Sequence, residues 1–399
     1  MSTAIAYHDR PPATAELVIV GGGVAGAATA FYAARAGLHP VLLERRPALA
    51  TLTTAAATGG FRLQFESREE LELVRESVEL FLNFASLTGQ ATYDPQVRQQ
   101  GYLWVTTEEA VAERQRQLVA RQHTWGQQDV ELLGGAEARR RFPYLSERVI
   151  QARFRQGDGF LDPRQVTLGL AAGSRAAVVT GCGVTGFRLA GGRLVAVETT
   201  AGRISTPAAV IACGPLSGPL ATTVGLDLPL TTVRRQKVIL PDLPAVPADA
   251  PMTIDEDTGV HWRPALRGAY LLFTDPATPP SPPAEEVPTD SRFAFRLLDP
   301  RSPIGAARVA PFWRQVWEHG AAPWMLQAGQ YTYTPDHRPL LGATEVEGLW
   351  VNSCCSGHGV MGSPAGSRLL VDLLTGRRPG EANPFRLDRH FVAPEVATL

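Results

Sequence analysis

A glycine-rich turn near the N-terminus has the residue types and the spacing that bind a dinucleotide. Gly21, Gly23 and Gly26 follow directly on the apolar run 17–20 and precede a segment rich in alanine. In such a GxGxxG pattern the first glycine allows a tight turn, the second lets the backbone approach a pyrophosphate, and the third lets a helix pack closely on a strand. The N-terminus of that helix then offers unpaired N–H groups to the phosphates. The pattern therefore predicts that the chain binds a dinucleotide cofactor.

An acidic residue narrows the choice of cofactor. Glu44 lies 18 positions after Gly26, at the end of the apolar run 41–43. A carboxylate at this place accepts hydrogen bonds from ribose hydroxyls and repels a 2′-phosphate. We therefore expect NAD or FAD rather than NADP.

A second glycine-rich turn, at 357–362, favours FAD over NAD. An apolar helix is expected to begin at Pro364 and to stop at Gly376. The positive end of its dipole would face the turn, where it would stabilise the negative charge of a reduced flavin. A nicotinamide needs no such partner. The same residues also fit a helix whose start is only a structural cap.

The elements that must position these turns alternate between strands and helices. The apolar runs 17–20 and 41–43 lack polar alternation, which indicates buried parallel strands, and a helix is expected between them at 25–36. A further helix is expected at 70–86. The segment 184–215 predicts two short strands, a turn and a buried strand. This order predicts an α/β fold with a strand–helix–strand unit at its N-terminus.

The net charge, the length of the apolar runs and the spacing of histidines and cysteines argue against several other classes of function. The net charge of -1 provides no field that would attract nucleic acid. No apolar run reaches the ~18 residues of a membrane helix. The N-terminus lacks the features of a secretory signal, so we expect a cytoplasmic location. No HxxE or HxH spacing occurs, and the adjacent Cys354 and Cys355 are poorly spaced for zinc, so we expect no metal site.

Several longer motifs follow one another along the chain. VIVGGGVAGAATAFYAARAG is followed by LLER, then by DGFLDPRQVTLGL and VIACGPLSG, and finally by YTYTPDHRPLLG and SGHGVMGSPAGSRLLVDLLTG. In this combination the chain resembles the D-amino-acid-oxidase-type FAD-dependent oxidoreductases, a family that includes sarcosine oxidase, glycine oxidase and dimethylglycine dehydrogenase. The resemblance implies a Rossmann-like FAD-binding domain with an inserted antiparallel-sheet substrate domain. We expect the FAD-binding domain at 1–90, 146–224 and 325–399, and the substrate domain at 91–145 and 225–324.

The resemblance also implies which residues contact FAD. The ADP half would be contacted by the first glycine-rich turn, by the residues after the second strand and by a strand near the adenine, namely Gly21, Gly23, Val24, Ala25, Gly26, Glu44, Arg45 and Val184. The pyrophosphate and the flavin ring would be wrapped by a loop of small residues that includes Thr53, Thr54, Gly59 and Gly60. The isoalloxazine would be lined by Gly357, His358, Gly359, Val360 and Met361. Further cofactor contacts are expected in the VIACGPLSG motif, at Cys213 and Gly214.

Departures from the family pattern predict that the FAD is bound non-covalently. Some relatives attach the flavin to a cysteine where Gly329 stands, and others to a histidine in a loop that corresponds to 45–66, where this chain has none. Some oxidases hold the substrate carboxylate with a lysine at the position of Met361, and others activate oxygen with a lysine near Leu272. Because both lysines are absent, we expect modest reactivity with oxygen and a secondary or cyclic amine as substrate.

The chemistry that the resemblance implies is the oxidation of a C–N bond in a small amine or amino acid. The flavin accepts a hydride at N5, an imine forms, and oxygen or another electron acceptor reoxidises the cofactor. Arg62 follows the flavin loop and is the expected anchor of a substrate carboxylate, because a guanidinium binds a carboxylate through two parallel hydrogen bonds. His358 and Tyr331 are the other expected catalytic residues. Arg62 could instead hold the loop, and His358 could have a purely structural role.

Two alternative functions remain open from the sequence. The chain could be a flavin-dependent tailoring enzyme that acts on a larger secondary metabolite, or a flavoprotein subunit that passes electrons to a partner protein. A flavin monooxygenase is disfavoured, because the downstream segment typical of that class is absent.

Overall fold

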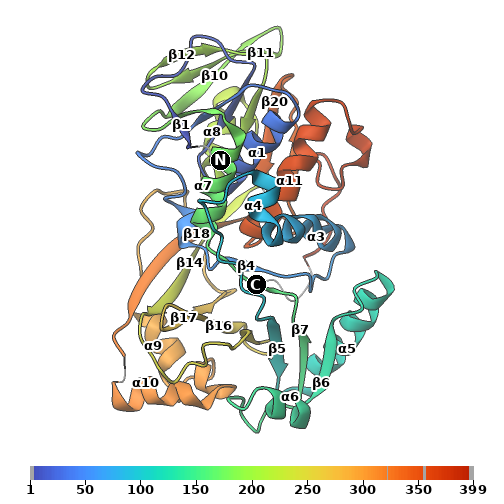
Figure 1. Cartoon of the computed structure of the whole chain (residues 1–399), viewed down its shortest axis with the longest axis vertical. Helices are drawn as coiled ribbons and strands as arrows, with labels where there is room; N and C mark the ends of the chain where they lie inside the picture. The colour runs from blue at the N-terminus through green and yellow to red at the C-terminus, as the bar shows by residue number, and fades with distance from the viewer. Residues whose placement is uncertain (1–3, 321, 354–355, 395–399) are drawn as a thin grey trace.

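The chain folds around two large β-sheets, which lie one above the other in Figure 1. The structure is a computed structural model and describes residues 4–320, 322–353 and 356–394. The two large sheets meet where β14 and β18 run toward the first sheet.

The first sheet is mostly parallel, and its seven strands follow the order β1-β9-β3-β2-β13-β20-β19. These strands are β1 (Ala6–Tyr7), β2 (Leu17–Val20), β3 (Pro40–Leu43), β9 (Ala177–Val179), β13 (Ala209–Ile211), β19 (Leu340–Ala343) and β20 (Leu349–Ser353). β2, β3 and β13 are buried along their whole length, because apolar clusters cover both faces of the sheet.

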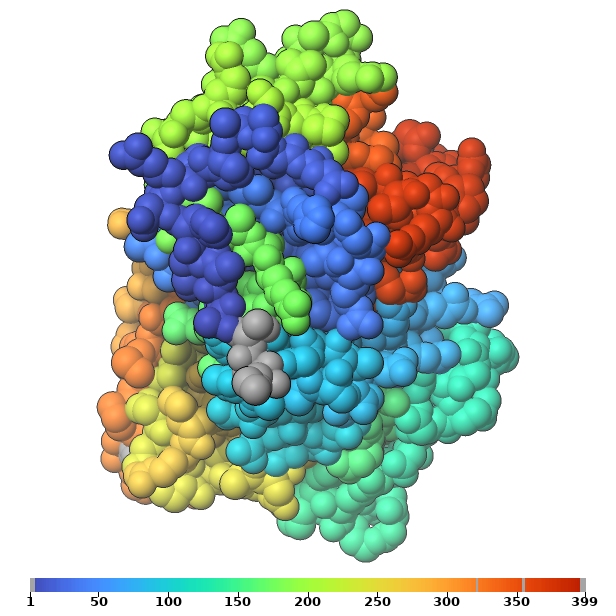
Figure 2. Space-filling view, turned by 45° about the horizontal axis from the view of Figure 1, so that its top comes forward, coloured from blue at the N-terminus to red at the C-terminus, as the bar shows by residue number. Residues whose placement is uncertain are grey.

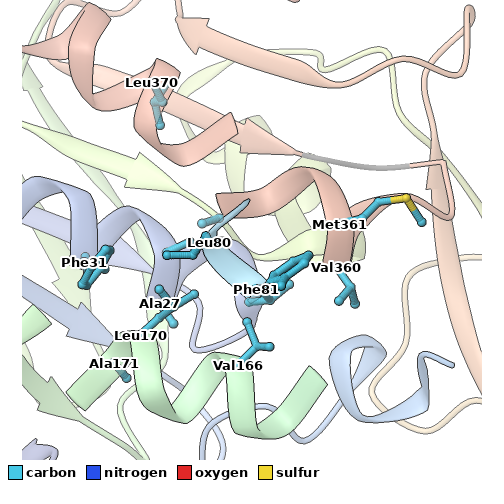
Figure 3. Close-up of a cluster of buried hydrophobic side chains, with 14 of the residues drawn as sticks. Ala27, Phe31, Leu80, Phe81, Val166, Leu170, Ala171, Val360, Met361 and Leu370 are labelled. Carbon is cyan, nitrogen blue, oxygen red and sulfur yellow. The ribbon is translucent and has the colours of Figure 1, made fainter. Parts of the chain in front are cut away.

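Helices cover one face of this sheet. They are α1 (Val24–Arg35), α3 (Arg68–Leu82), α7 (Pro163–Ser174) and α11 (Gly359–Leu374). Their apolar side chains form one buried cluster, part of which Figure 3 shows around Phe81 and Val166. The amide of Asn352 in β20 donates to Thr29 Oγ1 in α1 at 2.8 Å and to Ser367 Oγ in α11 at 2.9 Å. These buried hydrogen bonds tie the two ends of the sequence together.

A three-stranded sheet covers the other face. Its strands are β10 (Val184–Ala190), β11 (Arg193–Thr199) and β12 (Gly202–Ser205), in that order. The turn between β10 and β11 uses Gly191 and Gly192 with φ of 59° and 80°, a conformation that glycine adopts readily. This sheet forms the outer end of the molecule beyond the first sheet (Figure 1).

The second large sheet has eight strands in the order β18-β14-β17-β16-β15-β5-β7-β6 and is largely antiparallel. They are β5 (Tyr102–Thr106), β6 (Glu131–Gly134), β7 (Gln151–Arg155), β14 (Thr231–Leu240), β15 (Met252–Asp255), β16 (Val260–Ala265), β17 (Gly268–Phe273) and β18 (Met325–Tyr333). One face packs Val238, Trp262 and Leu271 against α9 (Arg292–Leu298) and α10 (Arg314–His319). The alternate residues of β14, including Arg235 and Lys237, are therefore directed to the opposite face.

The remaining elements connect these layers. They are α2 (Thr53–Ala56), β4 (Gly60–Phe61), α4 (Phe84–Thr88), α5 (Glu109–Thr124), α6 (Gly135–Arg141), β8 (Gly159–Phe160) and α8 (Ser217–Ala221), with short 3-10 turns elsewhere. In Figure 2 the N-terminal residues, in blue, lie beside the C-terminal residues, in red, while the yellow and orange segment that carries β14 to α10 lies at the other end. None of the helices in the described ranges combines the length and the apolar character needed to cross a bilayer.

The predicted α/β class is confirmed, as is the strand–helix–strand unit at the N-terminus. One helix start was wrong. α11 begins at Gly359 and not at Pro364, so the proline lies inside the helix. The sequence pattern favoured Pro364 because proline is common in the first turn. Because α11 starts earlier than predicted, its N-terminus lies within the second glycine-rich turn at 357–362.

Candidate active site

A cavity of about 440 Å³ lies between the two large sheets. On one side it is lined by the first glycine-rich turn, by residues 50–60 and by the start of α11. On the other side it is lined by residues of β14, β17 and β18, among them Arg235, Lys237, Leu272 and Tyr331. The cavity therefore joins the predicted cofactor turns to the predicted substrate region.

The first glycine-rich turn leaves open space where the pyrophosphate is expected. Gly21 has a φ of 115°, and a Cβ there or at Gly26 would collide with neighbouring carbonyl groups. These two glycines are therefore needed for the turn and for helix packing, as predicted. A Cβ at Gly23 would meet only Thr54 Oγ1, at 3.2 Å, within the described part of the chain. The space beside Gly23 thus belongs to the cavity, which fits a bound pyrophosphate.

Glu44 lies at the same end of the cavity, together with Arg45 and Val184. Its carboxylate accepts a hydrogen bond from the Gly22 N–H at 2.7 Å and another from the Arg46 N–H at 2.8 Å. The Arg45 guanidinium forms an ion pair with Glu285 at 2.6 Å. The backbone therefore fixes the Glu44 carboxylate at the edge of the cavity, where a ribose would lie if this end holds the ADP half.

Replacing Glu44 with alanine is expected to weaken FAD binding without abolishing it. The change removes an acceptor for ribose hydroxyls and also the bond that holds Gly22, and hydrogen bonds to a charged acceptor contribute about 1.5–3 kcal/mol each. A loss of about 10- to 150-fold in FAD affinity should be measurable by titrating the apoprotein with FAD and following flavin fluorescence. Unchanged affinity would mean that Glu44 does not contact the cofactor.

Cys213 and Gly214 also line the cavity, beside Val20. The Cys213 thiol donates to the Val20 carbonyl at 3.2 Å. Burial, followed by the nearby Glu44, raises the pKa of this thiol to about 12, so it stays protonated at neutral pH. Gly214 has a φ of 55° at the end of β13. The thiol therefore acts as a structural donor rather than as a nucleophile.

The loop of small residues at 53–60 borders the cavity, and its glycines are also constrained by the protein itself. A Cβ at Gly59 would collide with the Leu161 carbonyl, and one at Gly60 with the Tyr102 hydroxyl. Protein packing thus gives a reason for both glycines beside the predicted close approach of a cofactor. Thr54 Oγ1 accepts a hydrogen bond from the Val24 N–H at 3.2 Å, at the N-terminus of α1.

The start of α11 forms another wall of the cavity. Gly357, Gly359, Val360 and Met361 line it, and Figure 3 shows Val360 and Met361 in the first turn of the helix, next to the buried cluster. Ser356 and Gly357 have φ of 61° and 82°, which directs the backbone into a tight turn before the helix. The positive end of the α11 dipole is therefore directed at the cavity.

His358 does not itself line the cavity and lies behind Arg62. The Arg62 Nη2 atom is 3.1 Å from His358 Nε2, and His358 Nδ1 is 3.2 Å from Glu70 Oε1. A guanidinium can only donate, so Nε2 accepts and the Nδ1–H donates to the carboxylate. Burial and the Arg62 charge lower the pKa of His358, which keeps the imidazole neutral. His358 therefore orients Arg62, and its partner Glu70 was missed from the sequence.

Arg62 is a buried cation that has no ion-pair partner among the residues that the structure describes. Its side chain lines the cavity and is 4% exposed. Across the described ranges, no carboxylate lies within 4.0 Å of it, and its Nε–H has no hydrogen-bond acceptor. Phe65 and Trp104 lie beside the guanidinium, with ring centroids at 4.8 and 5.6 Å. A buried charge without a counter-ion is costly, so this arrangement fits an anionic ligand that binds from the cavity.

The second sheet supplies the opposite wall of the cavity. Tyr331 lies there, and burial raises the pKa of its phenol to about 12, so the hydroxyl stays neutral. Lys237 pairs with Leu272 across β14 and β17. An amine thus lies opposite Leu272, near the position where some relatives carry a lysine and this chain does not. The expectation of modest oxygen reactivity stays untested, but the absence of a lysine no longer supports it.

The contacts of Lys237 were not predicted from the sequence. Its Nζ atom donates to the carbonyls of Ala56 and Ala57 at 2.9 and 3.2 Å, and the residue lines the cavity. A signal was present in the sequence, because Lys237 is the only lysine in the chain.

At the two positions where some relatives attach the flavin, this chain has neither the cysteine nor the histidine. Gly329 lines it where a cysteine would be needed, and residues 45–66 contain no histidine. We therefore expect acid precipitation of the purified protein to leave all the yellow colour in the supernatant, as read from its absorbance. Colour retained in the washed pellet would show a covalent bond to a different residue.

Metal binding has no visible basis in residues 4–320, 322–353 and 356–394, where no group of three or more His, Cys, Asp or Glu side chains could hold an ion. Cys354 and Cys355, considered above for zinc, lie outside these ranges.

Comparisons with known proteins identify the family of this chain. The family model described as DAO, FAD dependent oxidoreductase, matches residues 16–373. The chain is 26% identical to human mitochondrial sarcosine dehydrogenase over 95% of its own length but only 42% of that protein. It is 27% identical to a D-amino acid dehydrogenase of Cereibacter sphaeroides, covering 95% of this chain and 96% of the other. The fold matches L-proline dehydrogenase from P. horikoshii with a TM-score of 0.80 at 22% identity, over 93% and 96% of the two chains.

Proposed function

Because the chain belongs to the DAO family of FAD-dependent oxidoreductases, we propose that its substrate is a secondary or cyclic amine that carries a carboxylate. The observation that carries this proposal is Arg62, a buried guanidinium that lines the cavity and whose Nε–H has no acceptor in the described part of the chain. Sarcosine dehydrogenase and L-proline dehydrogenase, which are similar to this chain, are named for a secondary and a cyclic amine with a carboxylate, and this supports the proposal.

We propose that FAD lies along the whole cavity. The ADP half is held by the turn at 21–26 and by Glu44, the pyrophosphate by the N-terminus of α1 and Thr54, and the flavin by the start of α11. Bound FAD supplies a site that accepts a hydride from the carbon next to the substrate nitrogen. Two orphaned polar atoms in cavity-lining residues, Asn352 Oδ1 and Ser363 Oγ, have no partner in the described part of the chain and fit a polar ligand.

The residues of the chain bind and orient the substrate. Arg62 binds the carboxylate, and the Glu70–His358 pair fixes the direction of its guanidinium. Met361 and Tyr331 give the substrate apolar surfaces and exclude water. Met361 replaces a cation that would otherwise grip a small amino acid, so glycine and sarcosine should be poor substrates.

We also propose a division into two domains that follows the sheets. The FAD-binding domain expected at 1–90, 146–224 and 325–399 contains the first sheet, and the substrate domain expected at 91–145 and 225–324 contains most of the second. β7 and β18 pair with strands of the second sheet, so the division is better drawn after residue 155 and after residue 333.

A screen for flavin reduction tests the proposed function. The holoprotein is mixed without oxygen with a panel of N-methyl amino acids, cyclic imino acids and primary amino acids, and the absorbance of the oxidised flavin is followed. We expect cyclic imino acids and N-methyl amino acids larger than sarcosine to bleach the flavin faster than glycine or sarcosine. Absence of bleaching by every amine would contradict the proposed function, and bleaching by primary amino acids alone would contradict the substrate class.

A further inference from the structure

Lys237 is unique in this chain. Among 38 lysine and arginine residues it is the only lysine, and its side chain is 3% exposed. Lysine and arginine differ in how readily they lose a proton in a buried site. A lysine can lose its proton near neutral pH when it is desolvated, whereas an arginine stays charged.

The surroundings of Lys237 disfavour its charged form. The Tyr270 ring of β17, whose centre lies 4.5 Å from Nζ, is a contact that favours the charged form, but burial outweighs it. Within the described ranges no carboxylate approaches Nζ to 4.0 Å, and the charged groups that face it are Arg263 of β16 and Arg164 of α7. Burial, followed by these two arginines, lowers the pKa of Lys237 to about 7.

The hydrogen bonds of Nζ leave one position free. Two N–H bonds are donated to the carbonyls of Ala56 and Ala57. A neutral amine that donates twice still has its lone pair, and Lys237 lines the cavity. Nζ can therefore accept a proton from a molecule in the cavity without breaking its contacts with the loop.

Holding the loop does not explain why this residue is a lysine. Arg263 Nε donates in the same manner to the next carbonyl, that of Thr58, at 2.9 Å. An arginine thus performs this holding role one residue further along the loop. The property that only Lys237 adds is a nitrogen that can exist without its proton.

Resting on the proposed function, we propose that the neutral Nζ of Lys237 is the base that removes a proton from the ammonium group of the bound substrate. One N–H bond of the substrate breaks, one N–H bond of Lys237 forms, and the substrate nitrogen keeps its electron pair. Lys237 then releases the proton to solvent before the next turnover. The step delivers the amine in the neutral form that can lose a hydride.

The chemistry requires such a step at neutral pH. A free alkylammonium group has a pKa of about 10, so about one amine in a thousand is neutral at pH 7. A base is most effective when its own pKa lies near the working pH. The geometry places this base in the same cavity as the carboxylate anchor Arg62.

Direct titration of Lys237 is the first test, and it uses the unaltered holoprotein. Because the chain contains a single lysine, selective ¹⁵N-lysine labelling gives one side-chain signal, whose shift reports the protonation state. We expect a midpoint near pH 7. A midpoint above pH 9 would overturn the proposal, because Lys237 would then carry its proton throughout the working range.

The pH dependence of flavin reduction is the second test, with Lys237→Met and Lys237→Arg. In the wild type the second-order rate constant of anaerobic reduction should level off above pH 7. In both variants it should fall about 10²- to 10⁴-fold at pH 7. It should then rise about tenfold for each pH unit up to the pKa of the free amine, because only neutral substrate reacts. Lys237→Arg keeps the charge and the donors, so a wild-type profile in this variant overturns the proposal.

The outcomes separate this inference from the proposed function. If no amine reduces the wild-type flavin, the proposed function fails. If amines reduce it and the variants change only reoxidation by air, the base assignment fails alone. If either variant cannot bind FAD, the titration of the wild-type lysine decides.

Discussion

Replacing Gly23 with valine is expected to give a folded protein that contains no FAD. A Cβ at this position meets only Thr54 Oγ1, at 3.2 Å, among the described residues, so the fold has room for the side chain. The pyrophosphate is expected to occupy this same space, and the branched side chain of valine would fill it. Flavin content after purification and circular dichroism of the same sample would measure the two effects separately.

A matched substitution shows whether the effect is specific. A Cβ at Gly134 would meet no atom of the described residues within 4 Å, and this glycine lies in β6, away from the cavity. Gly134→Val should therefore keep its full FAD content. Full occupancy in Gly23→Val as well would mean that the cofactor does not cross the turn at 21–26.

Replacing Arg62 with methionine is expected to lower kcat/KM for a carboxylated amine by about 2–4 kcal/mol, or roughly 30- to 1000-fold. The guanidinium is buried and has no ion-pair partner among the described residues, so a substrate carboxylate would be its counter-ion. Methionine fills a similar volume, lacks a charge and leaves the substrate carboxylate unpaired in a desolvated cavity. Steady-state rates with an electron-accepting dye would measure the loss.

The control for Arg62 is a substrate rather than a second variant. A decarboxylated analogue of the same amine makes no bond to the guanidinium, so its rate should change little. Equal losses for both amines would show that Arg62 supports the loop at 53–60, and FAD content would then fall as well.

Local patterns predicted the parts of the site that depend on neighbours in sequence. The turn at Gly21 to Gly26 follows its strand and opens its helix within a few residues, so the spacing defines the structure. Arg62 was predicted as a site residue for the same reason, because it directly follows the loop at 53–60, and it lines the cavity. The α11 start was misplaced because proline at 364 imitates a first turn.

The parts that were missed depend on contacts between distant segments. Glu70 meets His358 across 288 positions, and Lys237 meets Ala56 across 181. Neither pair has a local pattern, because the two large sheets and their helices bring the partners together. The packing constraint on Gly60 was likewise hidden from the sequence, since the Tyr102 hydroxyl that excludes a side chain there belongs to the second sheet.

The buried bonds from Asn352 to Thr29 and Ser367 have a consequence for how the protein is made. A growing chain on the ribosome carries the glycine-rich turn and α1 long before β20 and α11 exist. Until then the walls formed by residues 352–353 and 356–363 are missing, and the nascent polypeptide has only one side of the cavity. Cofactor capture is therefore a late event that follows synthesis of the last segment, and the long-range closure of the first sheet makes that event slow compared with local helix formation.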